Sequence, residues 1–215
     1  MSQKTFSLQA GEKSVELPVL SGSIGPDCVD IGKLYKESGT FTYDPGFMST
    51  ASCRSAITYI DGDAGVLQYR GYPIEQLAKH SNFSEVSYLL MNGNLPDKAE
   101  LSKFEHEVTH HSMMHEAFRT FLYGFRHDAH PMAMMTGMLG SLAAFYHSDL
   151  NLDDPEARRM AAIRLLAKVP TIAAACYRYS IGWPIRYPKN NLEYVDRFLH
   201  MMFEVPSEPL HLKPV

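Results

Sequence analysis

The spacing of apolar residues separates the chain into a short stretch that alternates like strands and a longer one with helical periodicity. In the first 70 residues, short apolar runs are broken by turn residues, among them Gly11 and the acidic triplet 61–63. Runs of this kind predict strands and hairpins. The expected elements are a hairpin of residues 5–8 and 15–20, a short helix at 30–36, a strand at 41–43 with a turn at 44–46, and a second hairpin at 57–70.

From residue 71 onward, apolar residues recur three and four positions apart, as on one face of a helix. Capping residues mark several helix starts. Asp97 forms a capping box with Glu100, while Ser84 and Asp154 stand at N-cap positions. The eight helices predicted here cover residues 73–79, 85–91, 98–112, 116–125, 130–147, 155–169, 170–181 and 192–203. The sequence therefore predicts a mainly α, multihelical fold, with a β-rich segment at 1–70 and a helical part at 71–215.

The helix expected at 130–147 is apolar around most of its circumference, which predicts burial on more than one side. Gly137, Gly140 and Ala144 interrupt that apolar surface with small side chains. Two glycines inside a helix cost roughly 1 kcal/mol each relative to alanine, so a close approach of another backbone is expected. The partner is either another helix of the same chain or the same helix of a second copy in a dimer. The sequence leaves both open.

The composition argues against some classes of function but does not identify one. The formal net charge of −4 over 215 residues shows no basic bias, which argues against nucleic acid as a partner. We see neither an apolar run of membrane-spanning length nor a secretory signal, so we expect a cytoplasmic protein. The three cysteines are odd in number and far apart, which fits a reducing compartment and predicts small buried apolar groups. We expect no cofactor.

Two histidine groups are candidates for chemistry. His106 with His110, and His111 with His115, are pairs four residues apart, a spacing that lets two imidazoles reach one metal ion. No cysteine or HExxH motif completes a site, so we expect no metal and instead a solvated face. The second group lies at 126–130, where Asp128 is expected to cap the following helix.

Arg164 and Lys168 form a more informative pair. They lie four residues apart on one predicted helix and therefore point the same way. Tyr146 precedes that helix and could stack on a base or bond a phosphate. The alternatives are a solvated basic face and a site for a phosphate-bearing ligand.

Several stretches closely resemble the corresponding parts of citrate synthases, and the order and spacing resemble the type II enzymes of Gram-negative bacteria. These stretches are FTYDPGFMSTASCRSAITYIDGDAGVLQYRGYPIEQLA (41–78), RHDAHPMAMM (126–135), LAAFYH (142–147), RLLAKVPTIAAACYRYSIG (164–182) and FLHMMF (198–203). The resemblance implies part of the multihelical large domain of an enzyme that condenses acetyl-CoA with oxaloacetate to citrate and CoA. The reaction combines general acid–base work with electrostatic stabilisation in a closed cleft.

The family's catalytic histidines lie in motifs resembling HADHE and PLHGGAN, and neither motif occurs in these 215 residues. We therefore assign no catalytic residue. The resemblance implies an N-terminal half without the small domain, which is expected to be inactive alone. A non-catalytic helical module that responds to a nucleotide or supports assembly is the alternative.

Type II enzymes are inhibited by NADH, so the resemblance also implies an effector site. The positions that match it are Tyr146, Arg164, Lys168, His111, Ser112 and Asn190. His110 replaces an arginine of the family pattern, which removes a permanent charge and a bidentate donor, and Ser207 replaces a cysteine. The resemblance also implies that the helix at 130–147 forms a homodimer interface through Gly137, Gly140 and Ala144, with three dimers in a hexamer.

Overall fold

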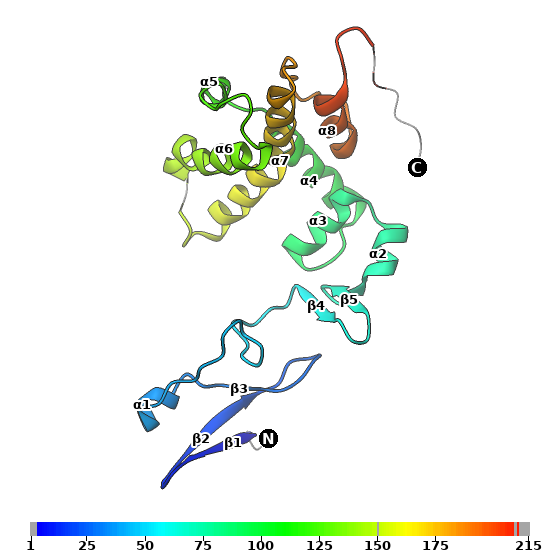
Figure 1. The fold of residues 1–215 in the computed structure, drawn as a ribbon. Helices are drawn as coiled ribbons and strands as arrows, with labels where there is room; N and C mark the ends of the chain where they lie inside the picture. The colour runs from blue at the N-terminus through cyan, green and yellow to red at the C-terminus, as the bar shows by residue number, and fades with distance from the viewer. Residues whose placement is uncertain (1–3, 150, 209, 211–215) are drawn as a thin grey trace. The chain divides into compact units, whose positions relative to one another are not determined.

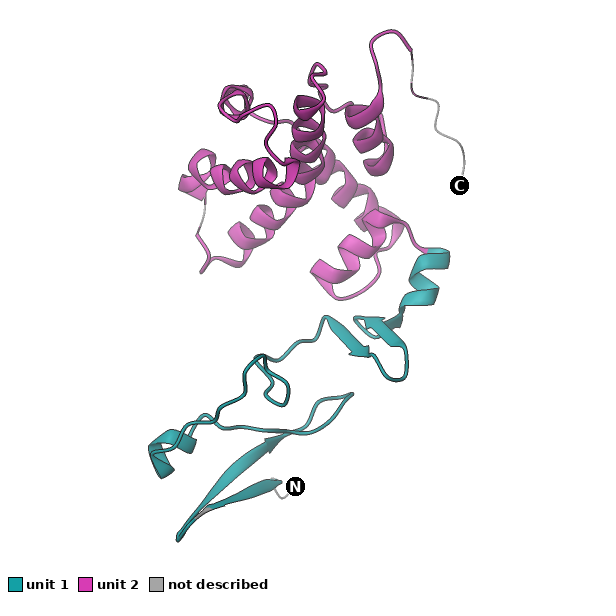
Figure 2. Cartoon of the chain, in the orientation of Figure 1, with its two compact units in different colours: residues 1–80 teal, residues 81–215 magenta. Residues whose placement is uncertain are grey.

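The computed structural model describes residues 4–149, 151–208 and 210. The chain forms two compact units, residues 1–80 and residues 81–215 (Figures 1 and 2). The first carries the strands and the second carries most of the helix, so the prediction of a mainly α, multihelical fold with a small β-rich start is confirmed.

The first unit contains two small antiparallel sheets, with strand orders β1-β2-β3 and β4-β5-β6. Its elements are β1 (Thr5–Ala10), β2 (Lys13–Leu20), β3 (Cys28–Val29), α1 (Leu34–Ser38), β4 (Thr58–Asp61), β5 (Val66–Tyr69), β6 (Tyr72–Pro73) and α2 (Ile74–His80). Both predicted hairpins are confirmed. Gly11, in the first turn, has a φ of +64°, a conformation that glycine adopts without steric cost. Val15, Leu17 and Leu34 form a small core.

Two predictions for this unit need correction. The strand expected at 41–43 is absent, because no neighbouring strand pairs with it and Phe41 stacks on Tyr35 instead, at 4.2 Å between ring centroids. The short helix begins at Leu34 and not at Asp30. The Asp30 carboxylate accepts the N–H of Gly32 at 2.9 Å, and this local bond competes with helix formation.

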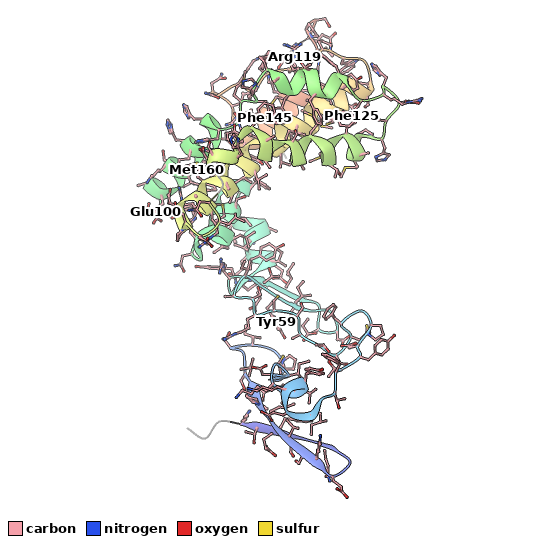
Figure 3. The ribbon with its side chains drawn as sticks, turned by 90° about the vertical axis from the view of Figure 1, so that its left-hand side faces the viewer. Tyr59, Glu100, Arg119, Phe125, Phe145 and Met160 are labelled. Carbon is pink, nitrogen blue, oxygen red and sulfur yellow. The ribbon has the colours of Figure 1, made fainter. Side chains whose placement is uncertain are left out.

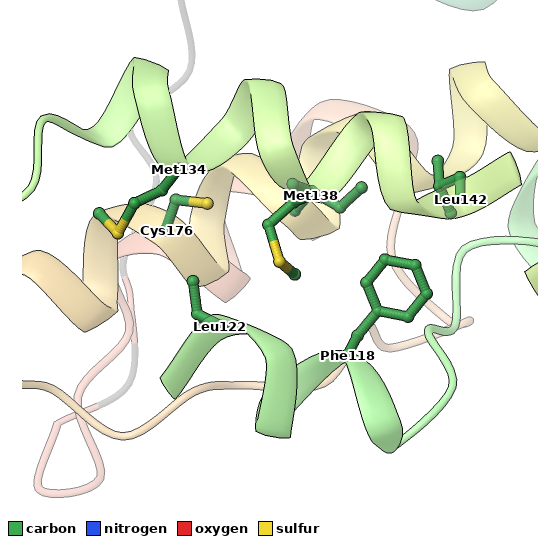
Figure 4. Close-up of a cluster of buried hydrophobic side chains, with 7 residues drawn as sticks. Phe118, Leu122, Met134, Met138, Leu142 and Cys176 are labelled. Atoms are coloured by element: carbon green, nitrogen blue, oxygen red, sulfur yellow. The ribbon is translucent and has the colours of Figure 1, made fainter. Parts of the chain in front are cut away.

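The second unit is helical and is arranged around one long helix, α7. Its elements are α3 (Phe83–Asn92), α4 (Lys98–His110), α5 (Ala117–Tyr123), α6 (Pro131–Phe145), a 3-10 turn η1 (His147–Asp149), α7 (Pro155–Ser180) and α8 (Tyr194–Phe203). Helices α4, α6 and α8 all pack against α7. The larger core cluster lies where α5, α6 and α7 meet (Figure 4) and consists of Phe118, Leu122, Met134, Met138, Leu142, Ile172 and Cys176. A second cluster, between α4 and α7, contains Phe104, Val108, Ile163 and Ala167.

Helix α7 replaces two predicted helices. A proline normally breaks a helix, because it lacks the N–H that would bond to the carbonyl four residues earlier. Pro170 lies inside α7, and the carbonyl it leaves without that bond belongs to Leu166. The Tyr194 hydroxyl donates to this same carbonyl at 2.9 Å, from the first residue of α8. A tertiary hydrogen bond therefore satisfies the group that Pro170 cannot.

Two predicted helix caps are wrong. Helix α3 is capped by Asn82, which forms a capping box with Glu85, and not by Ser84. Helix α6 is capped by His130, whose Nδ1 accepts the N–H of Met132, since Asp128 is engaged in an ion pair with Arg126 at 2.7 Å. The capping box of Asp97 and Glu100 on α4 and the N-cap role of Asp154 on α7 are confirmed.

By length and composition, α7 is the one helix among the described residues that could cross a membrane. This finding contradicts the expectation that no apolar run reaches this length, although the apolar stretch covers part of α7 and the helix as a whole carries scattered charges. Central helices of globular domains share this composition, and α7 packs against three others.

The cysteines differ from one another. Cys176 is buried in the larger core cluster, and burial raises the pKa of its thiol to about 11. The expectation of a buried apolar group is confirmed there, but it is wrong for Cys53, which is exposed. Cys28 is intermediate, and all three are free thiols.

The link between Pro170 and Tyr194 can be tested by a double-mutant cycle. Tyr194→Phe should lower the free energy of unfolding by about 1–2 kcal/mol, because it leaves the Leu166 carbonyl without a donor. In a Pro170→Ala chain the regained N–H can bond to Leu166, so the same change should cost less than half as much. Urea unfolding of the four chains measures both values, with Tyr43→Phe at a 92% exposed tyrosine as the control. Equal losses in the two backgrounds would refute the link.

Candidate ligand site between α6 and α7

A pocket of about 200 Å³ lies between α6 and α7. In Figure 3, Phe145 marks the end of α6 and Met160 the first half of α7. Most of the pocket lining is apolar, and it is formed by Leu139, Leu142, Ala143, Ala161 and Leu165. Three polar side chains complete it: Tyr146, Arg164 and Lys168. The pocket thus combines an apolar wall with two cations, which suits an organic molecule that carries a negative group.

Tyr146 holds the two cations near each other. The guanidinium carbon of Arg164 lies 4.7 Å from the centroid of its ring, and Lys168 Nζ lies 5.5 Å from it. Cation–π attraction of this kind contributes on the order of 0.5–2 kcal/mol and offsets part of the repulsion between the like charges. Tyr146 occupies this place because it forms the C-cap of α6, with its N–H bonded to the Leu142 carbonyl.

Lys168 is buried, with 3% of its surface exposed. Its ammonium donates to the carbonyl of His111 at 2.7 Å and to that of Met113, both in the segment that follows α4. Backbone carbonyls beyond a helix C-terminus favour a positive charge. An ammonium has three N–H donors, so one remains for the pocket. The expectation of a solvated basic face is therefore wrong for Lys168.

Arg164 is mostly buried and makes an ion pair. Its Nη2 lies 2.9 Å from Oδ2 of Asp149 in η1, with 20% of the Arg164 side chain and 49% of the Asp149 side chain exposed. Its Nε is buried and has no hydrogen-bond partner among the described residues. The guanidinium therefore retains a buried donor, and a carboxylate of the same chain already occupies its outer end.

The other predicted effector residues separate into two groups. His111 is linked to the pocket through its carbonyl, which accepts a hydrogen bond from Lys168, while the Ser112 carbonyl accepts one from Thr171 Oγ1 at 2.9 Å; neither residue lines the pocket. Asn190 does not join them. It lines a separate pocket of about 420 Å³ together with Thr109 and Arg197. Residues distant in the sequence thus reach the site, while one predicted member lies elsewhere.

The histidines on α4 make local contacts. The exposed His110 stacks beside His106 at 3.9 Å between ring centroids, and its Nδ1 bonds to the His106 carbonyl. His111 bonds through Nδ1 to the Glu107 carbonyl. Within the described residues, no group of three or more histidine, cysteine or acidic side chains has the geometry of a metal site.

The small residues of α6 have different surroundings. A Cβ added at Gly137 would lie 2.9 Å from Cζ of Phe125, so the close approach there is to a side chain of the same chain. A Cβ at Gly140 would meet nothing within 4 Å, and both Gly140 and Ala144 are exposed. Packing within one chain therefore explains why a small residue is needed at Gly137, but it does not explain the small residues at Gly140 and Ala144.

Sequence reasoning missed two buried arginines. Arg178 of α7 is fully buried and donates through Nη1 to the carbonyls of Met202 and Glu204, at 3.2 and 3.0 Å, where α8 ends. Arg197 of α8 is 5% exposed and donates to Thr109 Oγ1 at 2.7 Å. Arg178 has no acidic residue three or four positions away in the sequence. Their occurrence inside apolar helical segments was the one available signal.

Comparison with known proteins identifies the class to which this fold belongs. The helical unit, with its long central helix and its small β-rich companion, belongs to the multihelical class seen in solved citrate synthases. Residues 46–213 match the family described as "Citrate synthase, C-terminal domain". That match spans well over half of the chain, so the chain belongs to the citrate synthase family.

Solved structures agree with this assignment. The citrate synthase from Thermotoga maritima is 33% identical, with a TM-score of 0.65 over 75% of this chain and 42% of that one. The enzyme from Pyrobaculum aerophilum is 27% identical, with a TM-score of 0.64 over 94% of this chain and 47% of that one. A ternary complex of the Thermoplasma acidophilum enzyme with carboxymethyl coenzyme A and oxaloacetate shares the fold, with a TM-score of 0.66 at 24% identity over 72% of this chain and 40% of that one. The chain therefore spans less than half the length of each.

Proposed function

We propose that this chain is part of a citrate synthase that condenses acetyl-CoA with oxaloacetate to give citrate and CoA. The family match over residues 46–213 carries the proposal. The complex of the Thermoplasma acidophilum enzyme with a CoA derivative and oxaloacetate supports the two substrates. The HADHE and PLHGGAN motifs do not occur in these 215 residues, so the reacting groups of the proposed enzyme are expected in sequence beyond this stretch. We place the protein in the cytoplasm, which suits the exposed free thiol of Cys53.

An assay of CoA release tests this function. The 215-residue chain and the polypeptide encoded by any in-frame continuation of its gene are mixed with acetyl-CoA and oxaloacetate, and citrate is quantified by mass spectrometry. The continued polypeptide should form citrate, and the chain alone should not exceed the uncatalysed rate. A thiol reagent used in parallel needs a blank without oxaloacetate, because Cys53 is exposed. Citrate formation by the chain alone would contradict the proposal that the reacting groups lie outside these 215 residues.

We also propose that the pocket between α6 and α7 binds NADH as an effector, as in type II enzymes. The two cations beside Tyr146 are suited to a phosphate, and the apolar wall is suited to a flat ring. The His111 carbonyl accepts a hydrogen bond from Lys168, and Ser112 is the next residue in the chain. Asn190 lies in the other pocket, His110 lacks the permanent charge of arginine, and Ser207 lacks a thiol. The proposal therefore rests on Tyr146, Arg164 and Lys168.

Arg164→Ala should weaken NADH binding about tenfold, because one charge-assisted contact is worth roughly 1.5–3 kcal/mol. Titration followed by NADH fluorescence measures the affinity. Lys103→Ala removes the same charge from an exposed position on α4 and should leave the affinity within about twofold. Unchanged affinity in Arg164→Ala would remove the pocket from the proposal.

The exposed side of α6 is our proposed contact with a second copy, in a homodimer that can assemble further into a hexamer. Its small residues Gly140 and Ala144 and the 61% exposed Met132 support it. Gly140→Leu should shift the sedimentation of the assembled protein toward the monomer by blocking close approach. Lys103→Leu is the control on α4. Gly137 is a poor test because Phe125 of the same chain fills that space. A Gly140→Leu protein that sediments like the parent would argue against this interface.

A further inference from the structure

The pocket between α6 and α7 contains a carboxylate beside the cation that an anionic ligand would need. Asp149 lies in η1 and holds Nη2 of Arg164 at 2.9 Å. Arg164 also lies over the ring of Tyr146 at 4.7 Å, so the guanidinium is fixed from two directions. Asp149 contributes nothing to the lining of the pocket, which is formed by other residues. Asp149 therefore acts on the pocket only through its ion pair with Arg164.

The two ends of this arginine differ. Nε is a buried donor without a partner among the described residues, whereas Nη2 lies 2.9 Å from the Asp149 carboxylate in an ion pair. A guanidinium binds a phosphate or carboxylate best through two parallel N–H donors. A phosphate held by Nε and Nη2 would therefore lie beside the Asp149 carboxylate, and repulsion between the two anions favours displacement of Asp149.

The exposure of the pair makes this displacement feasible. Asp149 is half exposed, and ion pairs that reach solvent are weak. Lys168 can add only a single contact, because backbone carbonyls engage two of its three donors, so it cannot replace the paired donors of Arg164. Arg164 is thus the cation whose availability decides whether an anion is held.

We propose that Asp149 is an internal competitor: it pairs with Arg164 in the empty protein, and a phosphate-bearing ligand competes with it for the guanidinium. This proposal rests on the effector function assigned above to the same pocket. The ligand meets only the fraction of molecules in which Arg164 is released, so the apparent affinity is reduced by that fraction. Asp149 therefore sets the concentration at which the effector acts, without touching the effector.

The first experiment needs no ligand. Phenylglyoxal modifies accessible guanidinium groups, and peptide mass spectrometry gives the rate at Arg164. Asp149→Asn should raise that rate at least threefold relative to the parent chain. Asp153→Asn, which removes the same charge from an exposed position four residues along the same loop, should leave the rate within about twofold. Equal rates at Arg164 in all three chains would overturn the proposal, whatever NADH does.

The second experiment measures NADH affinity by fluorescence titration for the same three chains. Asp149→Asn should bind NADH about three- to tenfold more tightly, and Asp153→Asn should bind like the parent. Weaker binding by Asp149→Asn would overturn the proposal, because Asp149 would then orient Arg164 for the ligand. If Arg164 reacts faster in Asp149→Asn while none of the chains binds NADH, the internal competition stands and the assigned effector is wrong.

Discussion

The helical unit depends on α7 remaining one continuous helix although it contains Pro170. Helix α7 supplies residues to both core clusters and packs on α4, α6 and α8, so a break at Pro170 would separate the surfaces it joins. The carbonyl of Leu166 is the weak point, since the bond it would receive within the helix is missing. Tyr194 closes that gap from α8. The same contact that completes α7 also positions the start of α8.

At two further places, buried cations of α7 donate to backbone carbonyls, as Tyr194 does at Leu166, and here the carbonyls lie at helix ends. Lys168 binds carbonyls of the segment leaving α4, and Arg178 binds the last carbonyls of α8. Carbonyls at helix C-termini carry partial negative charge and need donors. A buried cation without a carboxylate partner is stable only when such groups surround it. These two side chains therefore join helices through backbone groups.

Lys168 connects this structural role to the candidate site. Its ammonium fixes the segment after α4 while it lies near the ring of Tyr146, which also supports Arg164. The pocket is thus built from groups that already hold α4, α6 and α7 together. Arg164 differs, because its outer end is paired to a partly exposed carboxylate and can exchange partners. Within the pocket, one cation is bonded to backbone carbonyls and the other is paired with a partly exposed carboxylate.

Local patterns in the sequence determined the helices, the two hairpins, the capping box of Asp97 and the family, because each depends on residues close together in the chain or on their order. Tertiary contacts decided the rest. They made one helix of residues 155–180 and left 41–43 without a pairing strand. They also buried Lys168, placed Asn190 in another pocket and paired Arg164 with Asp149. The physical reason is common to all of these. Hydrogen bonds and charges are satisfied by whichever partner the fold brings near, and a linear pattern does not contain that partner.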